Sequence, residues 1–343
     1  MKTIKIISCF ALTSSVAMAT PFTFDGQMKV TIPVNKDGTA AQKQLVLPKM
    51  KVSKAARQQM HTALNLKAPA KAAFGEVPVR VKLGMQNTPV LDQGQHGTCV
   101  TFAVTAAVDA LLGAGDYVSQ LCNLELGSYL SINDRANYSG WEGTWGTETL
   151  NQINEFGVVS QNYQKLNGCA GVRVYNLDDE TDQGTPMSDI DFTSHSIPMK
   201  DVMDVHTILD ASTPNYGWGT VIDIRQALAK GNRVVVGMLL DTMIDNRVGA
   251  VGQMHVPGDT WMLVPQISDD ILNFPYFAGH EMVITGYDDS AVVTDDAGHT
   301  NYGVFTLRNS WSQYAGDQGN YYVTYDYFRL MGEEAHELSV NKE

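Results

Sequence analysis

The chain has 343 residues, of which 44% are hydrophobic, and its formal net charge is −13. This length and apolar content are sufficient for one large domain or two small domains with buried cores. The strong negative charge argues against nucleic acid as a partner, because the phosphate backbone would be repelled.

The first 19 residues have the layout of a secretory signal peptide. Lys2 and Lys5 give a positive start, an apolar segment covers residues 6–16, and an A-x-A cleavage site ends at residue 19. The apolar segment is too short to span a bilayer, and no later run reaches about 18 apolar residues. We therefore expect no membrane anchor and a secreted protein, either extracellular or periplasmic.

Residues 20–77 predict a β-hairpin followed by a helix. The segment "MKVTIPV" is strand-like, "NKDG" predicts a turn, and "SKAARQQMHTALNL" combines a Ser N-cap with helical apolar spacing. The following "KAPAKAAFGE" is typical of an exposed linker.

The same region is unusually basic. Residues 42–82 contain nine Lys or Arg and a single acid, Glu76. Such a segment beside an acidic body predicts electrostatic docking, although a solvated basic helix is the simpler alternative. If charge holds it, acid should favour its release by protonating the partners of Lys49, Lys51, Lys54 and Arg57.

The remaining elements change from helical to strand-like along the chain. A buried helix is expected over residues 98–114, and further helices at "GTETLNQINEFGVV" and "DIRQALAKGN". Strands are expected at "RVVVGML", "HEMVITGY", "YGVFTLRNSW" and "GNYYVTYDYF". A helical half over about 95–230 and a β-rich half over 231–343 predict an α+β fold with a cleft between two subdomains.

The cysteine count singles out one thiol. Cys9 leaves with the signal peptide, so three cysteines remain in the exported chain. Because this number is odd, at least one of them stays unpaired within the chain. The simplest partition pairs Cys122 with Cys169 and leaves Cys99 free. Cys99 starts the helix predicted over residues 98–114, where the helix dipole lowers a thiol pKa.

A nucleophilic thiolate also needs an acid/base group and a group that orients it. Of the histidines, His280 is best placed, at the start of the strand in "AGHEMVITGYDD". Asn309 follows another strand, in "LRNSWSQYAGDQGNYYV". Gln93 precedes Cys99 by six residues, close enough for its amide to reach the same site.

Three separated blocks resemble the papain family of cysteine peptidases. "LDQGQHGTC" resembles the family's QGxCGSCW, "GHEMVITGYDD" its GHAVxxVGY, and "RNSW" with the following "GNYYV" its KNSWGxxWGxxGYxxI. The segment "GTETLNQINEFGVV" is similar to the start of the family's Gly-Gly-containing helix. The blocks occur in the family's order and span most of residues 77–330.

The resemblance implies a papain-like fold and a role for each matching residue. Cys99 would be the nucleophile, His280 the acid/base, and Asn309 the group that holds the imidazole. Gln93 and the backbone N–H of Cys99 would bind the oxyanion. The predicted substrate-binding residues are Gly146, Gly279 and Trp311, and Trp311 would also shield the His–Asn contact from water.

The chain departs from the family at three positions near these blocks. His96 stands where a cysteine is common, Val100 replaces the usual Trp after the nucleophile, and Ser312 replaces the usual Gly after Trp311. None of these groups performs the chemistry, so we expect activity to survive. We also expect His96 itself to be a surface or loop residue.

The sequence therefore predicts a cysteine protease made as a zymogen, with a peptidase domain over residues 78–343. Its partners would be protein or peptide substrates and its own pro-region, residues 20–77, as an inhibitor. The resemblance implies no cofactor, and no His, Cys and acid spacing indicates a metal site. Two alternatives remain: a thiol acyltransferase such as a transglutaminase, and an inactive papain-fold binding module.

Overall fold

The computed structural model describes residues 20–69, 76–178, 186–244 and 248–341. The signal peptide expected at residues 1–19 lies outside the described residues. The strands are β1 (Phe22–Lys36), β2 (Thr39–Val52), β3 (Arg80–Lys82), β4 (Met203–Leu209), β5 (Arg233–Leu240), β6 (Gly252–Gln253), β7 (Pro257–Trp261), β8 (Tyr276–Asp295), β9 (Thr300–Arg308), β10 (Asn320–Thr324) and β11 (Gly332–Val340). The helices are α1 (Lys54–Ala63), α2 (Cys99–Leu112), α3 (Gln120–Ile132), α4 (Gly146–Phe156), α5 (Gln161–Asn167), α6 (Asp189–His195), α7 (Gly219–Ala229), α8 (Pro265–Asn273) and α9 (Tyr325–Met331).

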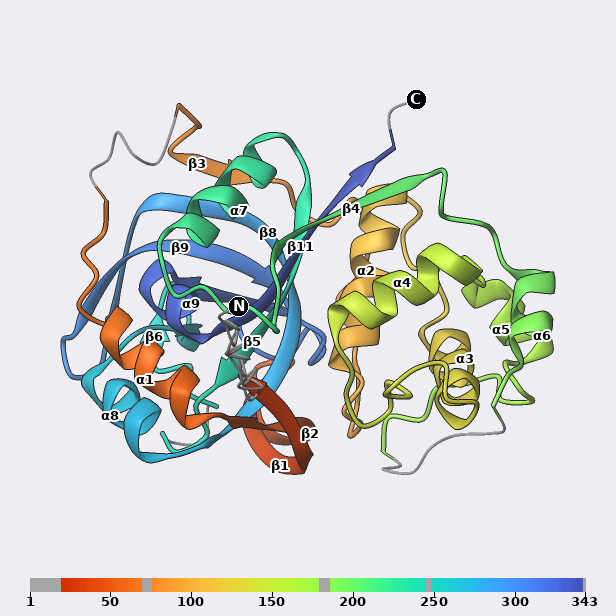
Figure 1. Cartoon of the computed structure of the whole chain (residues 1–343), viewed down its shortest axis with the longest axis horizontal. Coiled ribbons are helices and arrows are strands. Elements are labelled where there is room, and N and C mark those ends of the chain that lie inside the picture. The colour runs from red at the N-terminus through yellow and green to blue at the C-terminus, as the bar shows by residue number, and fades with distance from the viewer. Residues whose placement is uncertain (1–19, 70–75, 179–185, 245–247, 342–343) are drawn as a thin grey trace, which may run out of the picture.

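Helices α2 to α6 form one lobe and the strands form the other, as Figure 1 shows. The α+β fold predicted from the sequence is therefore confirmed. No helix within the described ranges combines the length and the apolar character that crossing a membrane requires.

The β-rich lobe is built around the long strand β8. Within the described residues the sheet runs β4-β11-β5-β8-β6-β7-β10-β9, and β9 pairs back onto β8, so part of the sheet closes on itself. Closure leaves those strands few free edges, and their residues Trp261, Phe305 and Val323 belong to the buried core of this lobe. Helix α2 packs against β8 and β5 and joins the two lobes.

The boundary between the two halves lies earlier in the chain than expected. β4 pairs with β11, and α7 packs on β4, β5 and β8, so residues 203–229 belong to the β-rich lobe rather than to the helical one. The stretch "YDYF", expected to continue a strand, begins α9, because Thr324 caps a helix there by accepting a hydrogen bond from the N–H of Tyr327.

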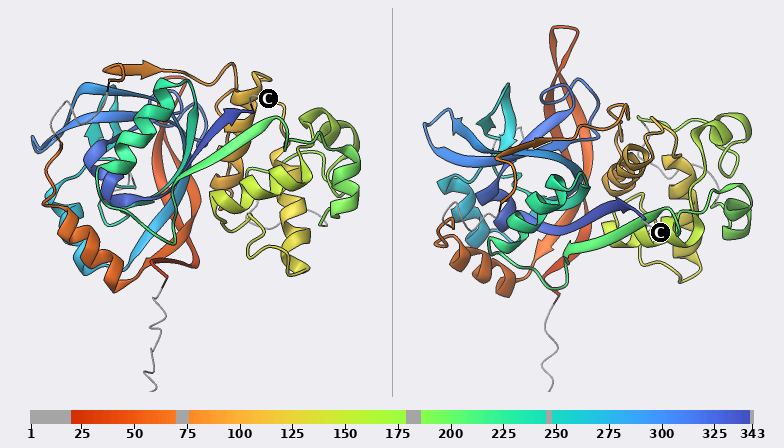
Figure 2. Two further views of the ribbon diagram at one scale, coloured as in Figure 1. Left: turned by 45° about the horizontal axis from the view of Figure 1, so that its top comes forward. Right: turned by 90° about the horizontal axis from the view of Figure 1, so that it is seen from above.

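The hairpin and helix predicted for the N-terminal segment are present. β1 and β2 pair antiparallel around the turn at Asp37 and Gly38, and the Ser53 hydroxyl caps α1 by accepting from the N–H of Ala56. β2 then pairs with β8 through residues 49–51, and α1 packs on α8. Figure 2 shows the hairpin between the two lobes, with its turn end projecting beyond them.

Apolar burial, more than charge, fixes this segment. Leu45, Leu47, Met50 and Met60 are at most 1% exposed and belong to the core of the β-rich lobe.

Contrary to the expectation from charge, Lys49 and Arg57 of this segment do not pair with acidic side chains of the body among the described residues. Lys49 pairs with Asp25 of the same hairpin at 3.0 Å, and Arg57 donates to the backbone carbonyl of Leu272. An ion pair to the body joins Lys43 to Asp92. The expectation that acid would release the segment by removing the partners of Lys49 and Arg57 therefore loses its physical basis.

Candidate active site

Cys99 is the first residue of α2, as predicted, and is 1% exposed. The helix carries small and branched apolar side chains and is buried on almost every face. Gly113 ends it in the left-handed conformation at φ 64°. Cys99 lines a small pocket together with His280, so the structure brings these two predicted residues to one place.

The imidazole of His280 is held by the side chain of Asn309. His280 Nε2 lies 2.7 Å from Asn309 Oδ1. The backbone N–H of Ser310 donates to the same Oδ1 at 2.7 Å, which identifies that atom as an acceptor. Nε2 must therefore carry the imidazole proton. Nδ1, which has no hydrogen-bond partner among the described residues, is then free to accept a proton.

Trp311 lies behind this pair. Its ring stacks on His280 at 4.5 Å and 24°, and the side chain is fully buried against Trp261 and Tyr321. This is the position of a shield around the His280–Asn309 contact, and Trp311 is not among the residues that line the pocket. The next residue, Ser312, adopts φ 75°, a left-handed conformation that glycine accepts with less strain.

Gln93 sits in the loop before α2, and the sequence does not reveal what fixes its amide. Gln93 Oε1 accepts from the hydroxyl of Ser310 at 2.9 Å, and Nε2 donates to the carbonyl of His96 at 3.0 Å. Because an amide nitrogen has two hydrogens, one remains for another acceptor. Ser310 therefore contacts both amides of the predicted site, Gln93 and Asn309.

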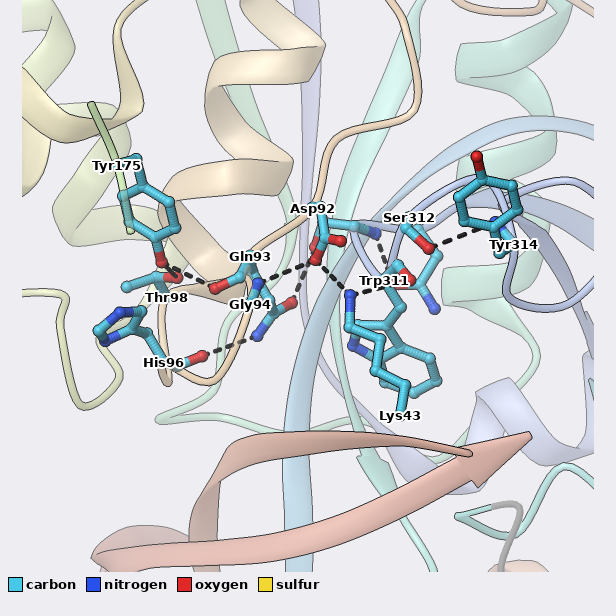
Figure 3. A network of polar contacts seen from close by, with 12 residues as sticks. Lys43, Asp92, Gln93, Gly94, His96, Thr98, Tyr175, Trp311, Ser312 and Tyr314 are labelled. Carbon is cyan, nitrogen blue, oxygen red and sulfur yellow. Dashed lines mark hydrogen bonds and ion pairs between the residues drawn. The ribbon is translucent and has the colours of Figure 1, made fainter. Parts of the chain in front are cut away.

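Two further residues hold the same loop (Figure 3). Tyr175, between α5 and α6, donates to the Gln93 carbonyl at 2.8 Å and lies 3.0 Å from the Thr98 hydroxyl. His96 is buried, with Nε2 3.1 Å from the carbonyl of Asn176. His96 lies in a loop, which was one of the two expectations, but it is not at the surface, because its ring packs edge-on against Trp141 and Tyr175.

Burial keeps the thiol and the imidazole neutral in this form of the protein. It raises the pKa of Cys99 to about 12, although a hydrogen bond with the backbone of Glu281 acts in the other direction. It lowers the pKa of His280 to about 4, although the Asn309 contact acts in the other direction. The low thiol pKa expected from the helix dipole is therefore not realised while the site is closed.

The N-terminal hairpin closes the site. Phe24, Pro48 and Met50 line the same pocket as Cys99 and His280. Phe24 also packs against Trp145 of the helical lobe at 5.1 Å, while β2 is paired with β8, so the hairpin contacts both sides. The side chain of Lys43 reaches from β2 to Asp92 and, at 3.3 Å, to the carbonyl of Trp311 (Figure 3).

The two predicted substrate-binding glycines lie around this pocket. Gly279 lines it directly, and the N–H of Gly146 donates to Glu334 Oε1 at 2.7 Å. Glu281, Glu333 and Glu334 line it as well, and sequence reasoning missed all three. Glu281 directly follows His280, and this adjacency in the sequence could have indicated that Glu281 lies at the site.

The predicted disulfide is present in the helical lobe. Cys122 of α3 and Cys169 are bonded, with Cα atoms 5.0 Å apart, and Cys99 is a free cysteine. The bond closes a separation of 47 residues and lies in a core that includes Leu121, Trp141 and Phe192.

No protein-family model and no curated protein matches the chain. Solved structures match it. Xylellain, a cysteine protease from Xylella fastidiosa, aligns with a TM-score of 0.50 and 17% identity over 80% of this chain and 91% of its own. The cysteine protease and lectin-like domains of Cwp84 from Clostridium difficile give a TM-score of 0.53 and 15% identity over 78% of this chain and 53% of theirs. The chain therefore has the fold of papain-like cysteine proteases.

Proposed function

We propose that this chain, whose fold is that of papain-like cysteine proteases, is a secreted cysteine peptidase made as a zymogen. One observation carries the proposal: His280 is held by Asn309, its Nδ1 has no partner in the described part of the chain, and it lines the same pocket as the free thiol of Cys99. A thiol beside an oriented imidazole suits acyl chemistry on a peptide bond.

In the proposed reaction His280 Nδ1 takes the thiol proton of Cys99. The sulfur then bonds to the peptide carbonyl carbon, and the carbonyl oxygen becomes an oxyanion. The free amide hydrogen of Gln93 and the N–H of Cys99 donate to that oxyanion. His280 returns the proton to the leaving amine as the C–N bond breaks, and water hydrolyses the thioester with His280 as base.

Inhibition by the hairpin follows from the same contacts. Phe24, Pro48 and Met50 occupy the approach to Cys99, and the surrounding burial disfavours the thiolate–imidazolium pair. Removing the segment of residues 20–77, or displacing it, would admit both water and substrate. Rehydration would then lower the thiol pKa and raise the imidazole pKa toward their usual ranges.

The test uses the full chain with a fluorescent casein substrate and a thiol-directed epoxysuccinyl probe. Peptidase activity should develop on incubation, with label only at Cys99, and Cys99→Ala should abolish both signals. Cys99→Ala activity equal to wild type would refute the proposal. Adding an amine acceptor distinguishes hydrolysis from acyl transfer, because a transferase would incorporate the amine into the product.

A further inference from the structure

The pocket beside Cys99 contains acidic side chains that the proposed reaction does not use. Glu281 extends from β8, and Glu333 and Glu334 extend from β11. All three are at most 3% exposed. Carboxylates are rarely buried unless they are paired, so their presence next to the candidate nucleophile needs an explanation.

Of these three carboxylates, Glu334 has hydrogen-bond partners for both of its oxygens. Glu334 accepts from the backbone N–H groups of Gly146 at 2.7 Å and Thr147 at 3.3 Å, at the start of α4. Its Oε2 also lies 2.8 Å from Nε2 of His336. Glu334 therefore ties α4 to β11 and has little capacity left for another partner.

Glu281 and Glu333 are different. The Oε1 atom of each is buried and has no hydrogen-bond partner among the described residues. The Nε2 atoms of His280 and His336 are engaged elsewhere, with Asn309 and with Glu334. Two unpartnered acceptors thus remain in one pocket, where each would gain from a donor.

Two glycines, Gly146 and Gly237, leave the space that the Glu281 carboxylate occupies. A Cβ atom on Gly146 would lie 2.8 Å from Glu281 Oε1, and a Cβ on Gly237 would lie 2.6 Å from Glu281 Oε2. Any larger residue at either position would displace Glu281. The backbone is therefore shaped around this carboxylate.

The present occupant of the pocket is Met50 of the hairpin. A Cβ atom on Gly279 would lie 2.7 Å from Met50 Cγ, so the thioether side chain reaches the pocket wall directly before His280. Methionine offers an unbranched apolar stem and no donor. In the closed pocket, burial first and then the charge of Glu334 raise the pKa values of Glu281 and Glu333 well above the ordinary carboxyl range.

We propose that this pocket, once Met50 leaves it, binds a lysine or arginine side chain of the substrate, with Glu281 and Glu333 as counterions. The inference rests on the proposed peptidase function. A basic side chain has an unbranched stem like that of methionine and adds the donors that the two acceptors lack. An acidic substrate side chain would be repelled, and an apolar one would leave both acceptors unpaired.

The first test needs no catalysis and uses the full chain. Met50→Lys places a cation in the pocket, and Met50→Gln is the uncharged polar control. At neutral pH the Lys variant should melt about 2 °C or more above the Gln variant. The difference in melting temperature should vanish or reverse when the two Met50 variants also carry Glu281→Gln and Glu333→Gln. It should persist when they instead carry the control substitution Glu155→Gln, on the exposed face of α4. A Gln variant as stable as the Lys variant, with all glutamates present, would overturn the proposal.

The second test measures specificity with the incubated full chain and a peptide library that varies each residue before the cleaved bond. At one position Lys or Arg should be preferred over norleucine by about 10-fold or more in kcat/KM. The double Glu281→Gln, Glu333→Gln variant should lose that preference. A norleucine preference, or a basic preference that survives the double substitution, would overturn the inference. If no peptide is cleaved, the proposed function fails, and the melting comparison alone decides on the pocket.

Discussion

Met50 of the N-terminal hairpin packs against the backbone of Gly279, one residue before His280. A Cβ atom at position 279 would stand 2.7 Å from Met50 Cγ and 3.3 Å from its sulfur. Because Met50 is 1% exposed and β2 pairs with β8 at this point, the closed hairpin depends on the missing side chain of Gly279.

Gly279→Ala should therefore loosen the hairpin. Overpacking of this kind costs about 1–3 kcal/mol, and about 1.4 kcal/mol corresponds to a tenfold change in an equilibrium. Iodoacetamide should label Cys99 about 10-fold faster in the variant than in the wild-type full chain. The matched control is Gly219→Ala, where a Cβ meets nothing within 4 Å. Equal labelling rates in both variants would mean that Met50 does not hold the site closed.

In the proposed reaction, Asn309 would orient His280 through its 2.7 Å contact without reacting itself. Because general acid–base catalysis contributes about 10²–10⁴-fold in total, Asn309→Ala should lower kcat by about 10- to 100-fold, less than Cys99→Ala does. The variant should also shift the acid limb of the kcat/KM profile, since the Asn309 contact raises the pKa of His280. A profile identical to wild type would remove Asn309 from this role.

Ser310 positions Gln93 through its hydroxyl. Gln93→Ala should lower kcat by about 10²–10³-fold, the value of one oxyanion donor. Ser310→Ala should lower kcat by a smaller factor with little change in KM, and Ser310→Thr should restore it because the donor returns. An unchanged kcat in a folded Gln93→Ala protein would place the oxyanion elsewhere.

Stability should fall as pH rises. The pKa values of Glu281 and Glu333 are higher in the closed protein than in the unfolded chain, first because of burial. Their contribution is therefore complete below the ordinary carboxyl pKa and is lost as pH rises through the raised values. The lowered pKa of His280 has the opposite effect, because its contribution to stability is lost as pH falls. Between about pH 5 and pH 8, the melting temperature should fall more in the wild type than in Glu281→Gln, Glu333→Gln. Parallel curves would contradict this prediction.

The disulfide should contribute to the stability of the helical lobe. A bond closing 47 residues is worth about 4 kcal/mol in the chain-entropy model. Cys122→Ala with Cys169→Ala should lower the free energy of unfolding by roughly that amount, and mass spectrometry of the unreduced protein should show two fewer hydrogens than the reduced form. A free thiol at both positions in the unreduced protein would refute the bond.

The sequence by itself determined the local elements and the residue types of the site. Ser53 before a helical apolar pattern predicts α1, because an N-cap acts within one turn. The cysteine count made Cys122–Cys169 the simplest pairing among the three cysteines that follow the expected signal peptide, and the structure contains this bond. The blocks around Cys99, His280 and Asn309 predicted which groups would meet.

Tertiary structure decided how the hairpin and the carboxylates are placed. The basic composition of residues 42–82 predicted docking by charge, but composition carries no information on register. In the fold, β2 pairs with β8, and Met50 is buried at the site. Glu281, Glu333 and Glu334 come from β8 and β11, which are separated along the chain by β9, β10 and α9. Only the packing of the sheet brings these carboxyl groups together, and burial is then the first cause of the raised pKa values of Glu281, Glu333 and Cys99.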